Sequence, residues 1–131
     1  MHVNSSDPVS HRGGPEHFVG DVWRDELARP DEHSRISINR MHFAPGARSD
    51  WHQHPLGQVI HVTEGVGLIQ ERGGEVRIMR AGETVVSPPG EWHWHGASAT
   101  SMMTMLGIQE THADEPLVCW GEPVSDEEYG A

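Results

Sequence analysis

Turn-forming residues recur at short, regular intervals along this chain, and this rhythm constrains the fold more than any other feature. Gly, Pro, Asn and Asp clusters interrupt the sequence roughly every 8–12 residues. Between them the side chains alternate with a period of two, most clearly over residues 35–43. Such short strands and frequent turns are typical of an antiparallel sandwich or barrel. The 15 Gly and 9 Pro further disfavour long helices, so we predict an all-β fold.

The pattern also divides the chain. We expect strands over residues 18–23, 35–43, 51–54, 58–63, 67–71, 75–79, 84–87, 92–96 and 101–110. Residues 1–16 are polar and rich in Gly, Ser and Pro, and we expect an N-terminal arm there. Residues 17–131 then form a single barrel domain. The pairing of Ser125 with Glu128 matches a capping box and predicts a short C-terminal helix over residues 125–129.

Composition excludes several classes of function. The net charge of −11 disfavours a nucleic-acid partner, because such binding depends on cationic contacts with phosphate. No apolar run approaches the roughly 18 residues of a membrane span, so no membrane partner is expected. The N-terminus lacks the pattern of a signal peptide, and we therefore expect a cytoplasmic protein. Because the chain contains no lysine, Schiff-base chemistry on lysine is excluded.

Four of the 11 histidines are arranged as two pairs on expected strands. His52 and His54 are two residues apart, as are His93 and His95. Side chains at this spacing on a strand share a face and lie about 6–7 Å apart, close enough to hold one metal ion. We expect the remaining histidines to lie outside any such site, at positions 2, 11, 17, 33 and 112 as solvated surface residues and at positions 42 and 61 as non-ligands.

Both pairs lie within longer motifs. The pattern G-x5-H-x-H-x3-E-x6-G is matched at every spacing by Gly46, His52, His54, Gln58 and Gly65, with Gln in place of Glu. The pattern G-x5-P-x-G-x2-H-x3-N is matched by Gly82, Pro88, Gly90 and His93, with Ala97 in place of Asn. Together they resemble the cupin family. The resemblance implies a double-stranded β-helix, or jelly-roll barrel, that is oligomeric, here a homodimer or homotetramer, with a metal in the barrel mouth.

The resemblance also implies the ligands. They are His52, His54, Gln58 and His93, holding one divalent transition metal per chain. Manganese is the first expectation and iron the next, while zinc, nickel and cobalt also suit imidazole and oxygen ligands. Because Gln58 is neutral, the charge of the ion stays uncompensated. This should weaken metal retention, favour anionic ligands and direct the site toward Lewis-acid rather than oxidative chemistry.

Other side chains are expected around the metal. His95 shares a face with His93, and we predict that it acts as a general acid and base in the pocket; a structural role or a role as an additional ligand stays open. The expected substrate pocket is lined by Met41, Ser49, Met105 and Gln109. Three tryptophans alternate with the inward residues and should serve sheet packing or a subunit interface, at positions 51, 92 and 94.

A closer resemblance concerns residues 52–58, 88–96 and 103–110, which look like the bacterial, manganese-dependent, cupin-type hydroxynitrile lyases. This implies a metal-dependent lyase that acts on a small hydroxy or carbonyl compound, cleaving or forming cyanohydrins. One departure is Met105, which stands where those lyases carry a second pocket histidine. A non-haem iron dioxygenase is the alternative, followed by an isomerase or cyclase and by a non-enzymatic module that binds small molecules.

Overall fold

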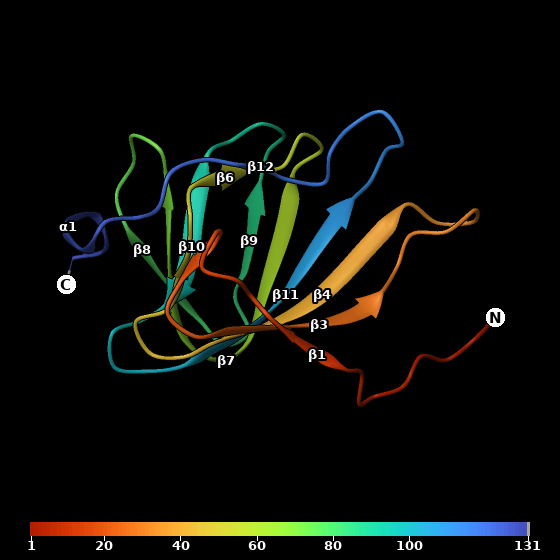
Figure 1. Ribbon diagram of the computed structural model, residues 1–131, viewed down its shortest axis with the longest axis horizontal. Coiled ribbons are helices and arrows are strands. Elements are labelled where there is room, and N and C mark those ends of the chain that lie inside the picture. Colours follow the sequence, from red (N-terminus) through yellow and green to blue (C-terminus); the bar gives the residue numbers. More distant parts are fainter. Residues whose placement is uncertain (131) are drawn as a thin grey trace.

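The computed structural model describes residues 1–130, and they form an all-β fold with one short helix, as predicted (Figure 1). The strands are β1 (Ser10–Arg12), β2 (Phe18–Val19), β3 (Val22–Ala28), β4 (Ile36–Phe43), β5 (Arg48–Ser49), β6 (His52–Gln53), β7 (Gln58–Glu71), β8 (Arg77–Arg80), β9 (Thr84–Ser87), β10 (His93–Ala97), β11 (Met103–Glu110) and β12 (Cys119–Trp120). The helix is α1 (Asp126–Tyr129). None of the helical structure within residues 1–130 is long and apolar enough to cross a membrane.

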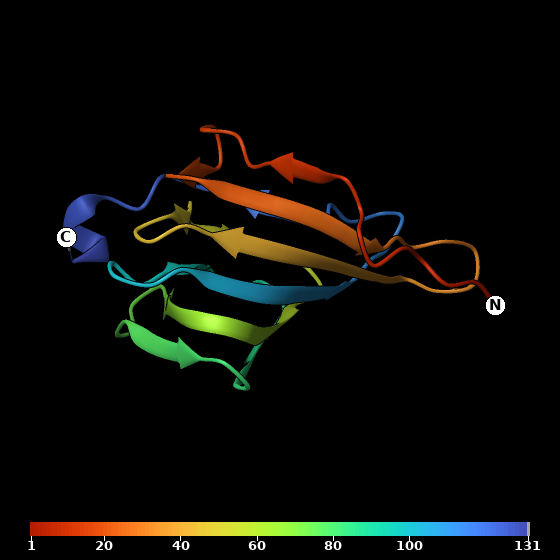
Figure 2. The same ribbon diagram turned by 90° about the horizontal axis from the view of Figure 1, so that it is seen from below.

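The strands form two antiparallel layers that are joined through the long strand β7. One layer follows the order β1-β3-β4-β11-β7, and β9 pairs with the first part of β7. Figure 2 shows β3, β4 and β11 side by side in this layer. The second half of β7 pairs with β8 and β10, and β10 continues to β5 and β6. One strand thus belongs to both layers and closes the expected jelly-roll barrel.

The change of layer within β7 occurs at Gly65, the last glycine of the first motif. Its φ is +77°, and a Cβ atom there would lie 1.9 Å from the carbonyl oxygen of Met102. A side chain is therefore excluded by both the backbone conformation and the close approach of the neighbouring chain. The motif glycine is therefore required by the fold.

The barrel interior combines an apolar core with a polar mouth. The β4 alternation is as predicted, with Ser37, Asn39, Met41 and Phe43 buried. The apolar core consists of Val22, Met41, Phe43, Ala47, Ile60, Val62, Ile69, Met79, Ala97, Met103 and Met105. Burial of these side chains supplies the main driving force for closing the barrel. The histidines lie beside this core.

The C-terminal segment packs on the outside of the second layer. Ser125 caps α1 through the predicted capping box with Glu128, and the Tyr129 hydroxyl donates a 2.8 Å hydrogen bond to the carbonyl oxygen of Ala97. Trp51 and Trp94 are buried against this segment. Packing within the chain, one of the two roles we expected, is therefore confirmed for Trp51 and Trp94, and the subunit interface stays a prediction.

At the other end of the chain, β1 pairs with β3, so part of the expected N-terminal arm is hydrogen-bonded into the first layer. The buried carboxylate of Asp25 on β3 accepts hydrogen bonds from Ser10, Arg40 and His42. The hydrogen bond from Ser10 anchors β1, whereas those from Arg40 and His42 join β3 to β4. The division into an arm over 1–16 and a barrel domain over 17–131 stays a prediction.

Candidate metal centre

Three neighbouring segments bring the predicted histidines together. His52 on β6 lies directly opposite His93 on β10 in the antiparallel pairing. His95 follows two residues later on the same face of β10, and His54 directly follows β6. Gln58 is the first residue of β7. All five side chains are buried, so water competes little for their polar atoms.

The imidazole rings form a compact cluster. The ring centroid of His52 lies 4.5 Å from that of His93 and 5.2 Å from those of His54 and His95. The centroid of His93 lies 5.8 Å from those of His54 and His95. Nitrogen atoms of His52, His93 and His95 all lie within 4.8 Å of one another, a separation that one ion can bridge. The His54 ring is adjacent but is not part of that tightest group.

Backbone carbonyl groups orient three of the four rings. The Nδ1 atoms of His52, His54 and His93 lie 2.8, 2.9 and 3.1 Å from the carbonyl oxygens of Asp50, Leu117 and Glu91, respectively. Because a carbonyl oxygen can only accept, we assign the proton of each neutral ring to Nδ1. Each Nε2 atom then carries a free lone pair, as metal-binding histidines require.

The surroundings of His93 give the clearest test of whether a cation fits. Its Nε2 atom lies 3.1 Å from Oε1 of Gln58, so with this tautomer and this assignment of the amide oxygen and nitrogen a lone pair faces an amide oxygen. Two acceptors at this distance repel each other unless a positive charge lies between them. The Nε2 atom of His54 is also buried without a hydrogen-bond partner. These unpaired acceptors fit a cation held by three imidazoles and one amide oxygen.

Burial keeps these imidazoles neutral. It lowers the pKa of His93 to about 4, the backbone contact to Glu91 opposing this only in part. Burial likewise lowers the pKa of His54 and holds the pKa values of His52 and His95 well below the usual range. All four rings therefore offer lone pairs at neutral pH without first losing a proton.

His95 differs from the three oriented rings. Its backbone N–H donates a 3.1 Å hydrogen bond to the Ser49 hydroxyl, but its Nδ1 atom is buried without a partner. Its ring packs edge-on against Phe43, with the centroids 5.6 Å apart. Since no carbonyl fixes its tautomer, His95 can hold its proton on either nitrogen. This freedom suits proton transfer, although its position also brings it within reach of an ion.

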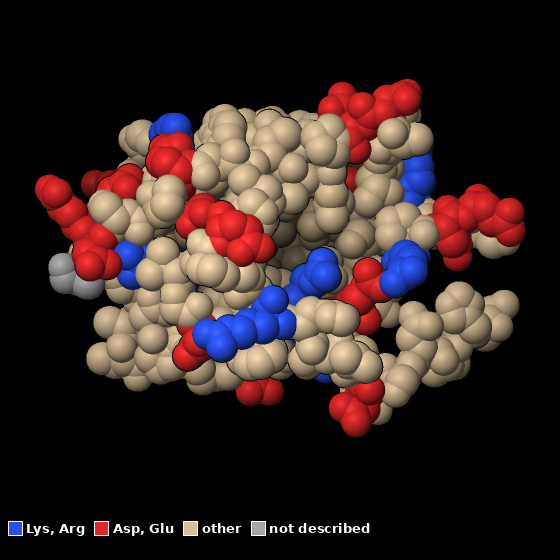
Figure 3. All heavy atoms as spheres, in the orientation of Figure 1, with Lys and Arg blue, Asp and Glu red and all other residues tan. Residues whose placement is uncertain are grey.

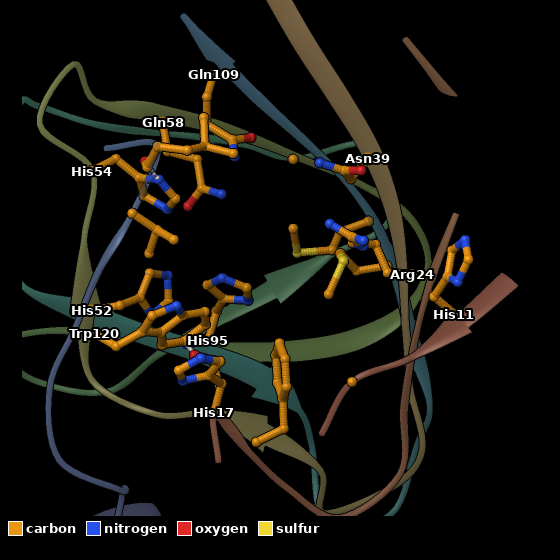
Figure 4. A pocket seen from close by; sticks show the side chains of 18 of the residues that line it. His11, His17, Arg24, Asn39, His52, His54, Gln58, His95, Gln109 and Trp120 are labelled. Atoms are coloured by element: carbon orange, nitrogen blue, oxygen red, sulfur yellow. Dashed lines mark hydrogen bonds between the residues drawn. The ribbon is translucent and has the colours of Figure 1, made fainter. Parts of the chain in front are cut away.

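A cavity of ≈ 360 Å³ opens beside the cluster (Figure 4). His52, His54, Gln58 and His95 line it, whereas His93 lines a second cavity. The structure also brings all four residues expected in the pocket to its wall, namely Met41, Ser49, Met105 and Gln109. The roles of these residues stay predictions.

The cavity wall contains residues that the sequence analysis missed. His17, expected as a solvated surface histidine, is half-buried; its ring stacks on Trp120 with the centroids 4.1 Å apart, and its Nδ1 atom lacks a partner. That expectation was wrong because His17 precedes β2, which pairs with β5 beside the cluster. Arg24 and Asn39 also line the cavity. The alternation along β4 could have predicted that Asn39 lies at the cavity, but nothing in the local sequence indicated that Arg24 does.

Comparisons with known proteins agree with this architecture. Residues 39–108 match the family model described as a cupin domain. The chain is 43% identical over 121 residues to an (R)-mandelonitrile lyase of Granulicella tundricola, covering 92% of each chain.

Two solved structures extend the comparison. A cupin-like protein of Thermotoga maritima is 36% identical, with a TM-score of 0.87 over 96% of this chain and 95% of that one. A second protein of the same organism, described as a predicted oxalate decarboxylase, is 21% identical, with a TM-score of 0.71 over 85% of this chain and all of the other, and shares the fold. The chain therefore belongs to the cupin family.

Proposed function

We propose that this cupin is a metal-dependent lyase of small hydroxy or carbonyl compounds, and specifically that it cleaves or forms cyanohydrins. The observation that carries the proposal is the set of three Nε2 lone pairs oriented by backbone carbonyl groups next to a cavity. The 43% identity to a mandelonitrile lyase supports the reaction class.

In this proposal His52, His54, His93 and Gln58 hold one divalent transition metal, with manganese ahead of iron. When bound, the ion supplies Lewis acidity toward an oxygen atom of the substrate. The neutral amide of Gln58 leaves the positive charge of the centre uncompensated, which favours an anionic oxygen or cyanide there. Met41 and Met105 contribute an apolar part of the cavity wall.

His95 is the proposed acid and base. In cleavage, its neutral imidazole accepts the proton of the substrate hydroxyl, the C=O bond forms, and the bond to the nitrile carbon breaks with its electron pair leaving on cyanide. Burial disfavours the imidazolium, so His95 readily returns the proton to cyanide as it leaves. The reverse sequence forms the cyanohydrin.

The test is turnover of mandelonitrile under nitrogen, which is measured through the release of benzaldehyde. The wild type should turn over without oxygen, His52→Ala should lose both metal and activity, and His95→Ala should keep the metal but lose activity. His61→Ala is the matched control, because the His61 ring forms a hydrogen bond with the Thr84 hydroxyl, on the side of β7 away from the histidine cluster. Unchanged activity in His95→Ala would refute its role in proton transfer.

Oxygen uptake with substrate would instead support the iron dioxygenase, and binding without turnover would support a small-molecule-binding module. An isomerase or cyclase would use the same groups on a different substrate. The only partner that we propose is a small-molecule substrate. A cytoplasmic location and a homodimer or homotetramer stay predictions.

A further inference from the structure

The cavity has a second polar region, away from the histidine cluster. Figure 4 shows Arg24 and Asn39 across the cavity from His52 and His54, with Gln109 between the two groups in this view. These three residues come from neighbouring strands of the first layer, since β3 pairs with β4 and β4 with β11. Neither the metal ligands nor His95 explain why polar side chains gather there.

The charge of the cavity wall is opposite to that of the chain. The protein carries 20 Asp and Glu against 9 Arg, yet none of the lining residues, all within the described range 1–130, is acidic. Arg12 and Arg24 both line the cavity. In the space-filling view, both Arg and acidic side chains border the central hollow, whereas its lining includes no acidic residue (Figure 3). A cavity with positive and no negative side chains attracts anions.

Arg24 is the unpaired one of these two cations. The guanidinium of Arg12 lies 2.5 Å from the Asp21 carboxylate, whereas that of Arg24 forms no ion pair or hydrogen bond with any residue of the described chain. Arg24 stands opposite Met41 in the pairing of β3 with β4, which places it on the cavity side. The acid two residues along β3, Glu26, is paired with Arg29 at 2.8 Å. The Arg24 guanidinium is therefore free to bind a ligand.

Two amides of the same cavity wall are buried and incompletely paired, namely Asn39 near Arg24 and Gln109, which lies beside Gln58. Asn39 is 8% exposed and Gln109 is 6% exposed, and the side-chain oxygen of each is buried without a partner in residues 1–130. These oxygens are acceptors that need a donor, which a carboxylate does not supply. Each amide also has an NH₂ group that can donate to an anionic oxygen.

We propose that Arg24, with Asn39 beside it, forms a subsite for a carboxylate group of the substrate. The substrate is then a small oxo acid or its cyanohydrin, whose carbonyl or hydroxyl oxygen lies at the histidine centre while its carboxylate lies at Arg24. Guanidinium groups bind carboxylates through two parallel hydrogen bonds, which also fixes the orientation of the acid. This assignment of the substrate class rests on the proposed lyase function of the same site.

The test compares two ligands of equal size, 4-oxopentanoate and its neutral amide, 4-oxopentanamide. Their affinities are measured by calorimetry on the protein as purified and again with EDTA, which prevents an ion from holding the carboxylate. The wild type should bind the acid at least about 10-fold more tightly than the amide in both conditions. Arg24→Met should abolish this preference, and Arg24→Lys should retain part of it.

Arg80→Met is the matched control, because it makes the same change of charge on β8, outside the cavity lining. It should keep the full preference for the acid. No preference in the wild type, or the same preference in Arg24→Met, would overturn the subsite. The binding measurement needs no turnover, so its result is independent of the lyase test. A preference for the acid would support the subsite even if cyanohydrin turnover failed, and turnover would support the lyase even if the preference were absent.

Discussion

Replacing the buried carboxylate that anchors β1 should destabilise the protein in a manner that depends on pH. Asp25 is 2% exposed. Burial raises its pKa, but the hydrogen bonds from Ser10, His42 and Arg40 outweigh this and lower it from 3.8 to about 2. A difference of this size corresponds to about 2 kcal/mol of stability for the ionised group. Asp25→Asn should therefore lower the free energy of unfolding by about 2 kcal/mol at pH 7.

The sign of the pH dependence follows from the lowered pKa. The contribution of Asp25 is fully present above 3.8, the value in the unfolded chain, and is lost as the pH falls through about 2. Urea unfolding at pH 7 and pH 3 should show the difference between wild type and Asp25→Asn shrinking by roughly half. Asp21→Asn is the control, because its ion pair with Arg12 is exposed and contributes little. An equal difference at both pH values would refute the reasoning.

Three further substitutions test the centre and its surroundings. Gln58→Glu should tighten metal binding by at least about 10-fold, because a carboxylate compensates the charge of the ion; competition with a chelator measures this, and weaker binding would count against the ligand assignment. Met105→His should raise cyanohydrin cleavage on the order of 100-fold by adding a second pocket base; an unchanged rate would show that the departure from the lyases is unimportant. Tyr129→Phe should cost about 1 kcal/mol in urea unfolding through the lost hydrogen bond to Ala97, with metal content unchanged.

Many strands and the same-face histidine pairs were predictable because they depend on local alternation and turn chemistry. Two strand predictions were wrong: the expected strands 58–63 and 67–71 form the single strand β7, and the expected strand 18–23 is divided between β2 and β3. The period of two over residues 35–43 places Asn39 and Met41 on one face, and β4 has that arrangement. The spacing of His93 and His95 likewise puts both rings on the inner side of β10. The capping box of α1 involves only residues three apart and was equally accessible.

What could not be predicted depends on contacts between distant segments. His17 contacts the site because β2 pairs with β5, which brings its ring onto Trp120, 103 positions later in the chain. The position of Arg24 at the cavity depends on the register between β3 and β4, which has a bulge after Glu26. Carbonyl groups that orient imidazoles, such as that of Leu117 beside His54, are contributed by backbone whose sequence carries no signal.

Elemental analysis of the purified protein beside His52→Ala and His61→Ala tests the central claim most directly. The account predicts about one divalent transition metal per chain in the wild type and in His61→Ala, and its loss from His52→Ala. Manganese would favour the lyase, and iron would move the dioxygenase ahead. Stoichiometric metal in His52→Ala, or none in the wild type even after reconstitution, would contradict the account.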